Sequence, residues 1–162
     1  MKRVKISRSD FIYIAKSKFK FGKEDCIEKL DHSKWVEFIE NHKDYFIWYE
    51  ETEAGIYRKN NMDKVPDWAR EQVIRELNKT DVNAEYNKKK GYYEIRVYFG
   101  IDGIIRIYFQ KKITYRHLEI LLDMAKHLDA LLLKNEKNVI DEKFIEKLKN
   151  DTITKKMGGA KT

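Results

Sequence analysis

The segment from residue 82 to residue 112 constrains the fold more than any other part of this 162-residue chain, because its apolar residues alternate. In residues 92–99 and again in 105–109, the apolar side chains stand at odd positions. Facing residues of an antiparallel pair share one face of the sheet, so odd positions must face odd positions. A two-residue turn at 102–103 would break this match. A three-residue loop at 101–103, with Gly103 left-handed, restores it and pairs 99 with 105, 97 with 107 and 95 with 109.

A third strand precedes these two, with Val82, Ala84 and Tyr86 at even positions. A four-residue loop at 88–91 places these three side chains opposite Val97, Ile95 and Tyr93. The three strands then share one apolar face. The sequence therefore predicts a three-stranded antiparallel meander over about 82–112.

Further elements are expected on either side of the meander. The aromatic run at 45–49 is typical of a strand, and Gly55 followed by an apolar pair predicts that it folds back as an aromatic hairpin over about 45–58. Pro66 suits the first position of a helix that runs to about residue 78. Thr114 is expected to cap a long helix over about 114–134 that packs on the meander. The apolar face of this helix carries Leu118, Leu121, Leu122, Ala125, Leu128 and Leu132.

N-terminal helices are expected before the aromatic run. The spacing of apolar residues predicts one over about 10–20, although the lysines at 16, 18 and 20 would equally suit a strand with one basic face. A second helix is expected near 24–30, and a third from the N-cap Ser33 to His42. Asp141 is expected to cap a short helix near 141–149. The prediction is thus one α+β domain over 1–150, followed by a flexible tail at 151–162.

The net charge of +7 belongs to the two ends of the chain. Residues 1–23 carry +7 and residues 134–162 carry +3, so the part between them is slightly acidic. Lysine-rich ends can neutralise phosphates, but they also serve as solvated surface. No apolar run approaches the ~20 residues that cross a bilayer, and the single cysteine, Cys26, has no internal disulfide partner. We therefore expect a cytoplasmic protein without a membrane partner.

Motifs of common catalytic and metal sites are missing from the sequence, including a glycine-rich phosphate loop, a nucleophile elbow and paired Cys or His ligands. Glu119, Asp123 and His127 follow one another at i, i+4 and i+8, a spacing that can hold a metal ion but is more typical of a salt-bridged helix surface. Asp129 is expected within the apolar face of the long helix, where it either meets water or a lysine, or faces a cleft. We expect no cofactor and no metal, and the sequence favours a non-catalytic protein over an enzyme.

The even positions of the second and third meander strands are expected on the face opposite the core. There Tyr98 faces Arg106, and Arg96 faces Tyr108. Interleaved tyrosines and arginines can stack unpaired bases and hold phosphates, and the same residue types are enriched at protein-interface hot spots. The alternatives are ordinary cation–π pairs on a solvated face, or a face that the N-terminal helices cover.

Trp68 and Arg75 form a second candidate surface. On a helix Trp68 falls beside Gln72 and Arg75, away from the side of Val73. An exposed tryptophan indicates a binding surface, unless its side chain folds over a neighbouring element.

These observations favour a protein-protein binding module, such as an inhibitor, an immunity-type protein or an assembly adaptor. The alternative is a binder of single-stranded nucleic acid, foremost RNA, that uses the Tyr and Arg face together with the basic N-terminal segment. An enzyme that uses Asp129 or the Glu119 ladder, and a structural subunit of a larger particle, stay open. The sequence does not identify the partner or the oligomeric state.

Overall fold

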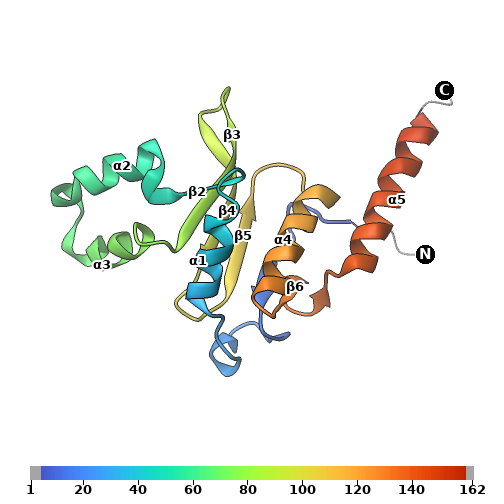
Figure 1. The fold of residues 1–162 in the computed structure, drawn as a ribbon, viewed down its shortest axis with the longest axis horizontal. Helices are drawn as coiled ribbons and strands as arrows, with labels where there is room; N and C mark the ends of the chain where they lie inside the picture. The colour runs from blue at the N-terminus through green and yellow to red at the C-terminus, as the bar shows by residue number, and fades with distance from the viewer. Residues whose placement is uncertain (1–4, 160–162) are drawn as a thin grey trace.

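The computed structural model describes residues 5–159, and side chains as far as residue 154. Within this range the chain is a mixed α+β protein with a seven-stranded antiparallel sheet and five α-helices (Figure 1). The strands are β1 Ile12–Ala15, β2 Phe46–Trp48, β3 Asp81–Asn87, β4 Tyr92–Phe99, β5 Ile105–Phe109, β6 Leu131–Lys134 and β7 Asn138–Val139. The helices are α1 His32–Glu40, α2 Glu53–Asn60, α3 Asp67–Glu76, α4 Tyr115–His127 and α5 Glu142–Gly159. The strand order is β2-β3-β4-β5-β1-β6-β7.

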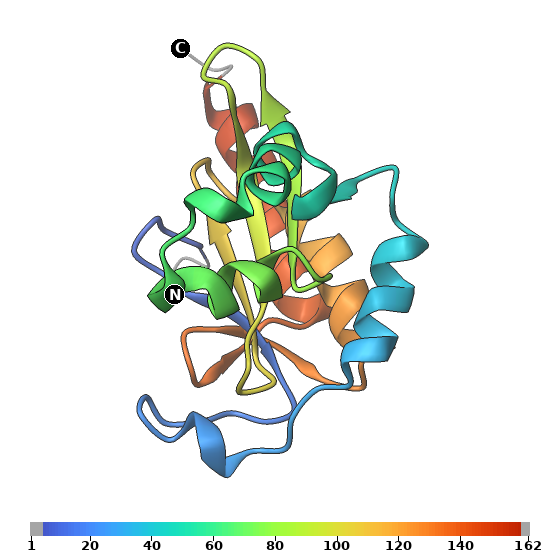
Figure 2. The same cartoon turned by 90° about the vertical axis from the view of Figure 1, so that its left-hand side faces the viewer.

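The main hydrophobic core lies between one face of the sheet and the helices α1, α4 and α5. At its centre the rings of Trp35 and Trp48 meet edge to face, with centroids 5.5 Å apart. Figure 1 shows α4 and α5 on one side of the sheet, and α2 and α3 on the other. In Figure 2 the view is from that other side, and α2 and α3 lie in front of the strands. The pair α4 and α5 and the pair α2 and α3 therefore lie on opposite faces of the sheet.

The meander is formed by β3, β4 and β5. β4 pairs with β5 at 95–109, 97–107 and 99–105, and β3 pairs with β4 at 82–97, 84–95 and 86–93, which are the pairs expected from side-chain alternation. Gly103 has a φ of +76°, and its N–H donates to the carbonyl of Gly100 over 2.9 Å. A Cβ at Gly103 would lie 2.4 Å from the Cβ of Lys29, so this turn needs glycine for its conformation and for its packing.

The predicted aromatic hairpin over 45–58 is wrong. β2 is a strand, but its partner is β3, and residues 53–60 form α2. The side chain of Thr52 caps this helix by accepting the N–H of Gly55 over 3.1 Å. A Cβ at Gly55 would lie 1.8 Å from the carbonyl oxygen of Tyr49, so this glycine permits close backbone packing and does not form a turn.

The N-terminal helix predicted over 10–20 is also wrong, because residues 12–15 form β1 between β5 and β6. All four residues of β1 are buried. A strand covered on both faces shows no alternation, which is why its apolar spacing resembled that of a helix. Near 24–30 the structure has only a 3-10 turn at Glu24–Cys26. α1 is present, but Asp31 caps it in place of Ser33, with its carboxylate accepting the N–H of Ser33 over 2.9 Å.

The long helix predicted over 114–134 ends at His127. Asp129 has a φ of +51°, in the left-handed region, and the N–H of Ala130 donates to the carbonyl of Ala125 over 2.9 Å. This hydrogen bond is typical of a helix that ends at a residue in the left-handed conformation. The chain then continues as β6. Asp129 is exposed, and its carbonyl accepts a hydrogen bond from Lys16 over 3.2 Å. The structure thus removes Asp129 from the apolar helix face, and the question of a buried carboxylate does not arise.

The C-terminal helix α5 begins after Asp141, whose carboxylate accepts the N–H of Phe144 over 2.9 Å, as expected of an N-cap. α5 extends to Gly159, so the predicted flexible tail is helical over 151–159, and residues 160–162 lie outside the described range. None of the helices described has the length and apolarity that a membrane crossing requires.

Candidate functional site

The outer face of β4 and β5 carries the expected arrangement of tyrosines and arginines. Arg96 pairs across the strands with Tyr108, and Tyr98 pairs with Arg106. The guanidinium carbon of Arg96 lies 5.3 Å from the ring centroid of Tyr98 and 5.6 Å from that of Tyr108. These distances fall within the range of cation–π contacts. The four side chains therefore form one continuous patch.

Arg96 is held by an internal carboxylate. Its Nε and Nη2 atoms donate to Oδ2 of Asp81 over 2.9 and 2.6 Å. Asp81 is 4% exposed, and this burial raises the pKa of its carboxyl, against the opposing effect of Arg96. Burial also works against the charge of Arg96, but the hydrogen bonds that it donates to Asp81, together with the charge of that carboxylate, outweigh this effect and raise the pKa of Arg96. The arginine charge is thus compensated from within the sheet.

Arg106 is compensated in the same way. Its Nη2 and Nη1 atoms donate to Oδ2 and Oδ1 of Asp102 over 2.7 and 3.1 Å. Burial acts to raise the pKa of Asp102, but the hydrogen bonds from Arg106 and from the N–H of Ile104 outweigh it and lower the pKa. Two arginines and two carboxylates therefore balance on this face, which leaves little free charge for phosphates.

The helix α3 joins the second candidate surface to the first. Nη2 of Arg75 donates to the hydroxyl of Tyr98 over 3.0 Å. Trp68 stands seven residues earlier, two helical turns away on the same side of α3. Its side chain is 87% exposed, so it does not fold over a neighbour. We call the six predicted residues together the Tyr/Arg surface: Trp68, Arg75, Arg96, Tyr98, Arg106 and Tyr108.

The helix beside the Tyr/Arg surface is α3, whereas one alternative raised from the sequence was a cover of N-terminal helices. The N-terminal segment instead contributes β1, in which Tyr13 pairs with Arg106 and is buried. Lys2 and Arg3 lie outside the described residues. The basic N-terminal segment therefore reaches this face through a strand of the sheet.

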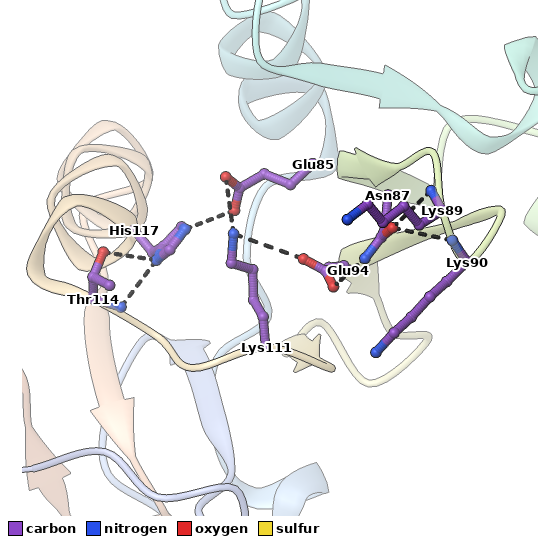
Figure 3. A network of polar contacts seen from close by, with 8 residues as sticks. All are labelled: Glu85, Asn87, Lys89, Lys90, Glu94, Lys111, Thr114 and His117. Carbon is purple, nitrogen blue, oxygen red and sulfur yellow. Dashed lines mark hydrogen bonds and ion pairs between the residues drawn. The ribbon is translucent and has the colours of Figure 1, made fainter.

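A second polar cluster, shown in Figure 3, was missed by the sequence analysis. The N–H of Thr114 donates to Nδ1 of His117 over 2.9 Å, and Nε2 of His117 lies 2.6 Å from Oε2 of Glu85. Because Nδ1 accepts the N–H of Thr114, Nε2 carries the ring proton and donates a hydrogen bond to Glu85. Nζ of Lys111 lies 3.5 Å from Glu85 and 3.7 Å from Glu94. The carboxylate of Glu85 thus accepts a hydrogen bond from His117 of α4 and forms an ion pair with Lys111.

Glu85 reaches this cluster through an unusual backbone. Its φ is +58° in the middle of β3, a left-handed conformation that costs on the order of 1 kcal/mol for a residue other than glycine. Alternation would place Glu85 on the outer face and Tyr86 on the core face. Instead Tyr86 and Tyr93 line a hollow with Thr52 and Glu53, at the start of α2. Nothing in the sequence pattern signals this reversal.

Tyr45 also faces Glu85. Burial and the neighbouring carboxylate both raise the pKa of the Tyr45 hydroxyl, so this side chain is neutral and acts as a hydrogen-bond donor. Strained backbone at such a cluster is typical of sites where the fold positions a side chain for contact with a ligand.

The ladder of Glu119, Asp123 and His127 does not form a site. Nε2 of His127 lies 3.6 Å from Oε1 of Glu37 on α1, and Glu119 and Asp123 are exposed. Within residues 5–154 no group of three His, Cys, Asp or Glu side chains is placed to hold a metal ion. The ladder is therefore helix surface.

Comparison of the chain with protein-family models, with curated proteins and with solved structures finds no match, so the geometry of its own residues is the basis for assigning a function.

Proposed function

We propose that the chain is a protein-protein binding module that engages its partner through the Tyr/Arg surface. The hydrogen bond of 3.0 Å between Arg75 and Tyr98 carries the proposal, because it joins the exposed Trp68 of α3 to the aromatic face of the sheet. Inhibitors, immunity-type proteins and assembly adaptors work through surfaces of this kind.

The composition of the surface suits a protein partner. Tryptophan, tyrosine and arginine dominate the hot spots of protein interfaces, and a single such residue often accounts for more than 2 kcal/mol of binding. Trp68 is the most exposed large apolar side chain among the described residues. An indole in that position can enter an apolar pocket of the partner, while the neighbouring tyrosines supply a flat rim.

The electrostatics of the surface favour a protein over a nucleic acid. Asp81 and Asp102 already occupy hydrogen-bond donors of Arg96 and Arg106. A phosphate would have to compete with these carboxylates for the same donors. The RNA alternative therefore depends on Arg75, whose side chain contacts the hydroxyl of Tyr98, and on the basic N-terminal segment.

A capture experiment with a matched pair of variants tests the proposal. The tagged chain, Trp68→Ala and Phe21→Ala are each used to isolate partners from an extract of the native host, with and without nuclease. Phe21 is the control because it is 84% exposed, like Trp68, but lies in the loop between β1 and α1 and is not one of the six residues of the Tyr/Arg surface. We expect one discrete protein that survives nuclease and Phe21→Ala but is lost with Trp68→Ala.

The affinity of the identified partner is then measured with purified proteins. Trp68→Ala should weaken binding by about 2 kcal/mol or more, which is at least ~30-fold in the dissociation constant. Equal binding by Trp68→Ala and Phe21→Ala would refute the proposal. Capture of nucleic acid that nuclease removes would favour the RNA alternative.

A further inference from the structure

A cavity of about 1090 Å³ opens beside the first turn of α4, between the residues that follow β5 and the middle of α5. Small-molecule sites typically measure ~300–1,000 Å³, so this cavity is large enough for an organic ligand. Its lining includes Ile120 of α4 and Leu148 of α5, so it lies on the side of the sheet that carries these two helices in Figure 1. None of the six residues of the Tyr/Arg surface lines it.

The walls of the cavity are largely apolar. Ile6 and Ile113 are buried, and Ile120 and Leu148 are partly buried against the same core. The rings of Tyr45 and Tyr115 complete the lining. Such walls favour a ligand with an apolar body, since burial of apolar area contributes about 25 cal/mol per Å².

The charges that line the cavity are unbalanced. Lys5, Lys112 and Arg116 line it without an ion pair to any carboxylate among the described residues. Of the two carboxylates in the lining, Glu85 is already bound by His117 and Lys111, which leaves Asp151. The cavity therefore has an excess of positive charge beside an apolar wall.

We propose that this cavity binds an amphipathic organic anion, such as a carboxylate with an aliphatic chain. Its carboxylate meets Lys112 and Arg116, and its apolar body packs on Ile113, Ile120 and Leu148. This ligand site is independent of the protein-binding function proposed above.

The structure argues against other ligand classes. A cationic amphiphile would have only Asp151 as a carboxylate partner, because Glu85 already accepts a hydrogen bond from His117 over 2.6 Å and lies 3.5 Å from Lys111. Lys5, Lys112 and Arg116 in the same lining would repel it. A polyphosphate would need hydrogen-bond donors along its whole length, whereas one wall here is built from isoleucine and leucine.

Fluorescence of anilinonaphthalene sulfonate, an aromatic anion, provides the assay with the full chain. We expect saturable binding of the dye, displacement by decanoate, and no displacement by decyltrimethylammonium, which has the same chain but the opposite charge. The double variant Lys112→Glu/Arg116→Glu should weaken decanoate binding at least about fivefold, because two exposed attractive charges are replaced by repulsive ones. Amide NMR shifts on addition of decanoate should centre on Ile113 and Ile120.

The matched control is Arg58→Glu/Lys59→Glu on α2, which changes the net charge equally on the other side of the sheet. This control should bind decanoate as the unmodified chain does. Trp68→Ala tests whether the dye binds the Tyr/Arg surface instead. No binding of either anion, equal displacement by the two amphiphiles, an unaffected Lys112/Arg116 variant, or NMR shifts centred on Trp68 would each overturn the proposal.

Discussion

Replacing Arg96 by methionine should destabilise the protein through the carboxylate that it leaves behind. Asp81 is 4% exposed, and Arg96 supplies its side-chain hydrogen bonds and its ion pair. Breaking a fully buried ion pair by removing one partner costs about 3–5 kcal/mol. The side chain of Arg96 is 43% exposed, so water can reach part of the vacated space. We therefore expect Arg96→Met to lower the free energy of unfolding by about 2 kcal/mol at neutral pH.

The loss should depend on pH, and its sign follows from the pKa of Asp81. Burial already raises this pKa above the ordinary 3.8, and Arg96 opposes that effect, so Arg96→Met should raise the pKa further. An acid with a raised pKa holds its proton more firmly in the folded state than in the unfolded state. The free energy of unfolding then falls as pH rises through the range above 3.8. The deficit of Arg96→Met should thus be largest near neutral pH and shrink as the pH approaches 3.8.

Urea denaturation at several pH values measures both effects, from the midpoint and the slope of each transition. The double variant Asp81→Asn/Arg96→Met should recover about half of the loss, because no charge is then buried without a partner. Lys59→Met on exposed α2 is the control, with an expected change below about 0.5 kcal/mol. A deficit below about 0.5 kcal/mol for Arg96→Met, or one that is the same at neutral and acidic pH, would refute this reasoning.

Two stability predictions concern local structure, and the same urea assay tests both. Gly103→Ala should lower the free energy of unfolding by about 2 kcal/mol or more, because a Cβ there lies 2.4 Å from Lys29 and the positive φ adds strain. Gly91→Ala should cost only about 1 kcal/mol, because its φ is +75° but its surroundings are open. Equal losses would contradict the packing argument. Asp31→Ala should cost about 1 kcal/mol as the loss of the α1 N-cap, and Ser33→Ala less than half of that; the reverse order would show that the cap is assigned to the wrong residue.

The meander was accessible from sequence because each of its strands has one buried and one solvated face. The parity of Ile95, Val97 and Phe99 then leaves a single register with the next strand. β1 lacks this signal, since Ile12 and Tyr13 are both buried although they point to opposite faces. In 131–133 the run of leucines continues the apolar spacing of α4, and only the left-handed turn at Asp129 separates helix from strand.

The part of the candidate site that lies on the meander was likewise predictable from the strand register. Register alone places Tyr98 opposite Arg106, and it also places Asp81 opposite Tyr98, beside Arg96. The strand register therefore contains enough information to place a carboxylate next to Arg96. The contact between Arg75 and Tyr98 is different, because it depends on how α3 returns to the sheet. The cluster around Glu85 depends on one left-handed residue inside a strand, which alternation rules do not anticipate.

The place of β1 in the sheet has a consequence for how the protein is made. β1 lies between β5 and β6, so residues 12–15 pair only with segments beyond residue 104. During synthesis β1 therefore emerges from the ribosome long before either partner strand has been made. The sheet is completed late, through contacts between distant parts of the chain. Such topologies fold slowly. During that delay both edges of an apolar strand are open to other chains, so the nascent protein is most prone to aggregation before β6 emerges.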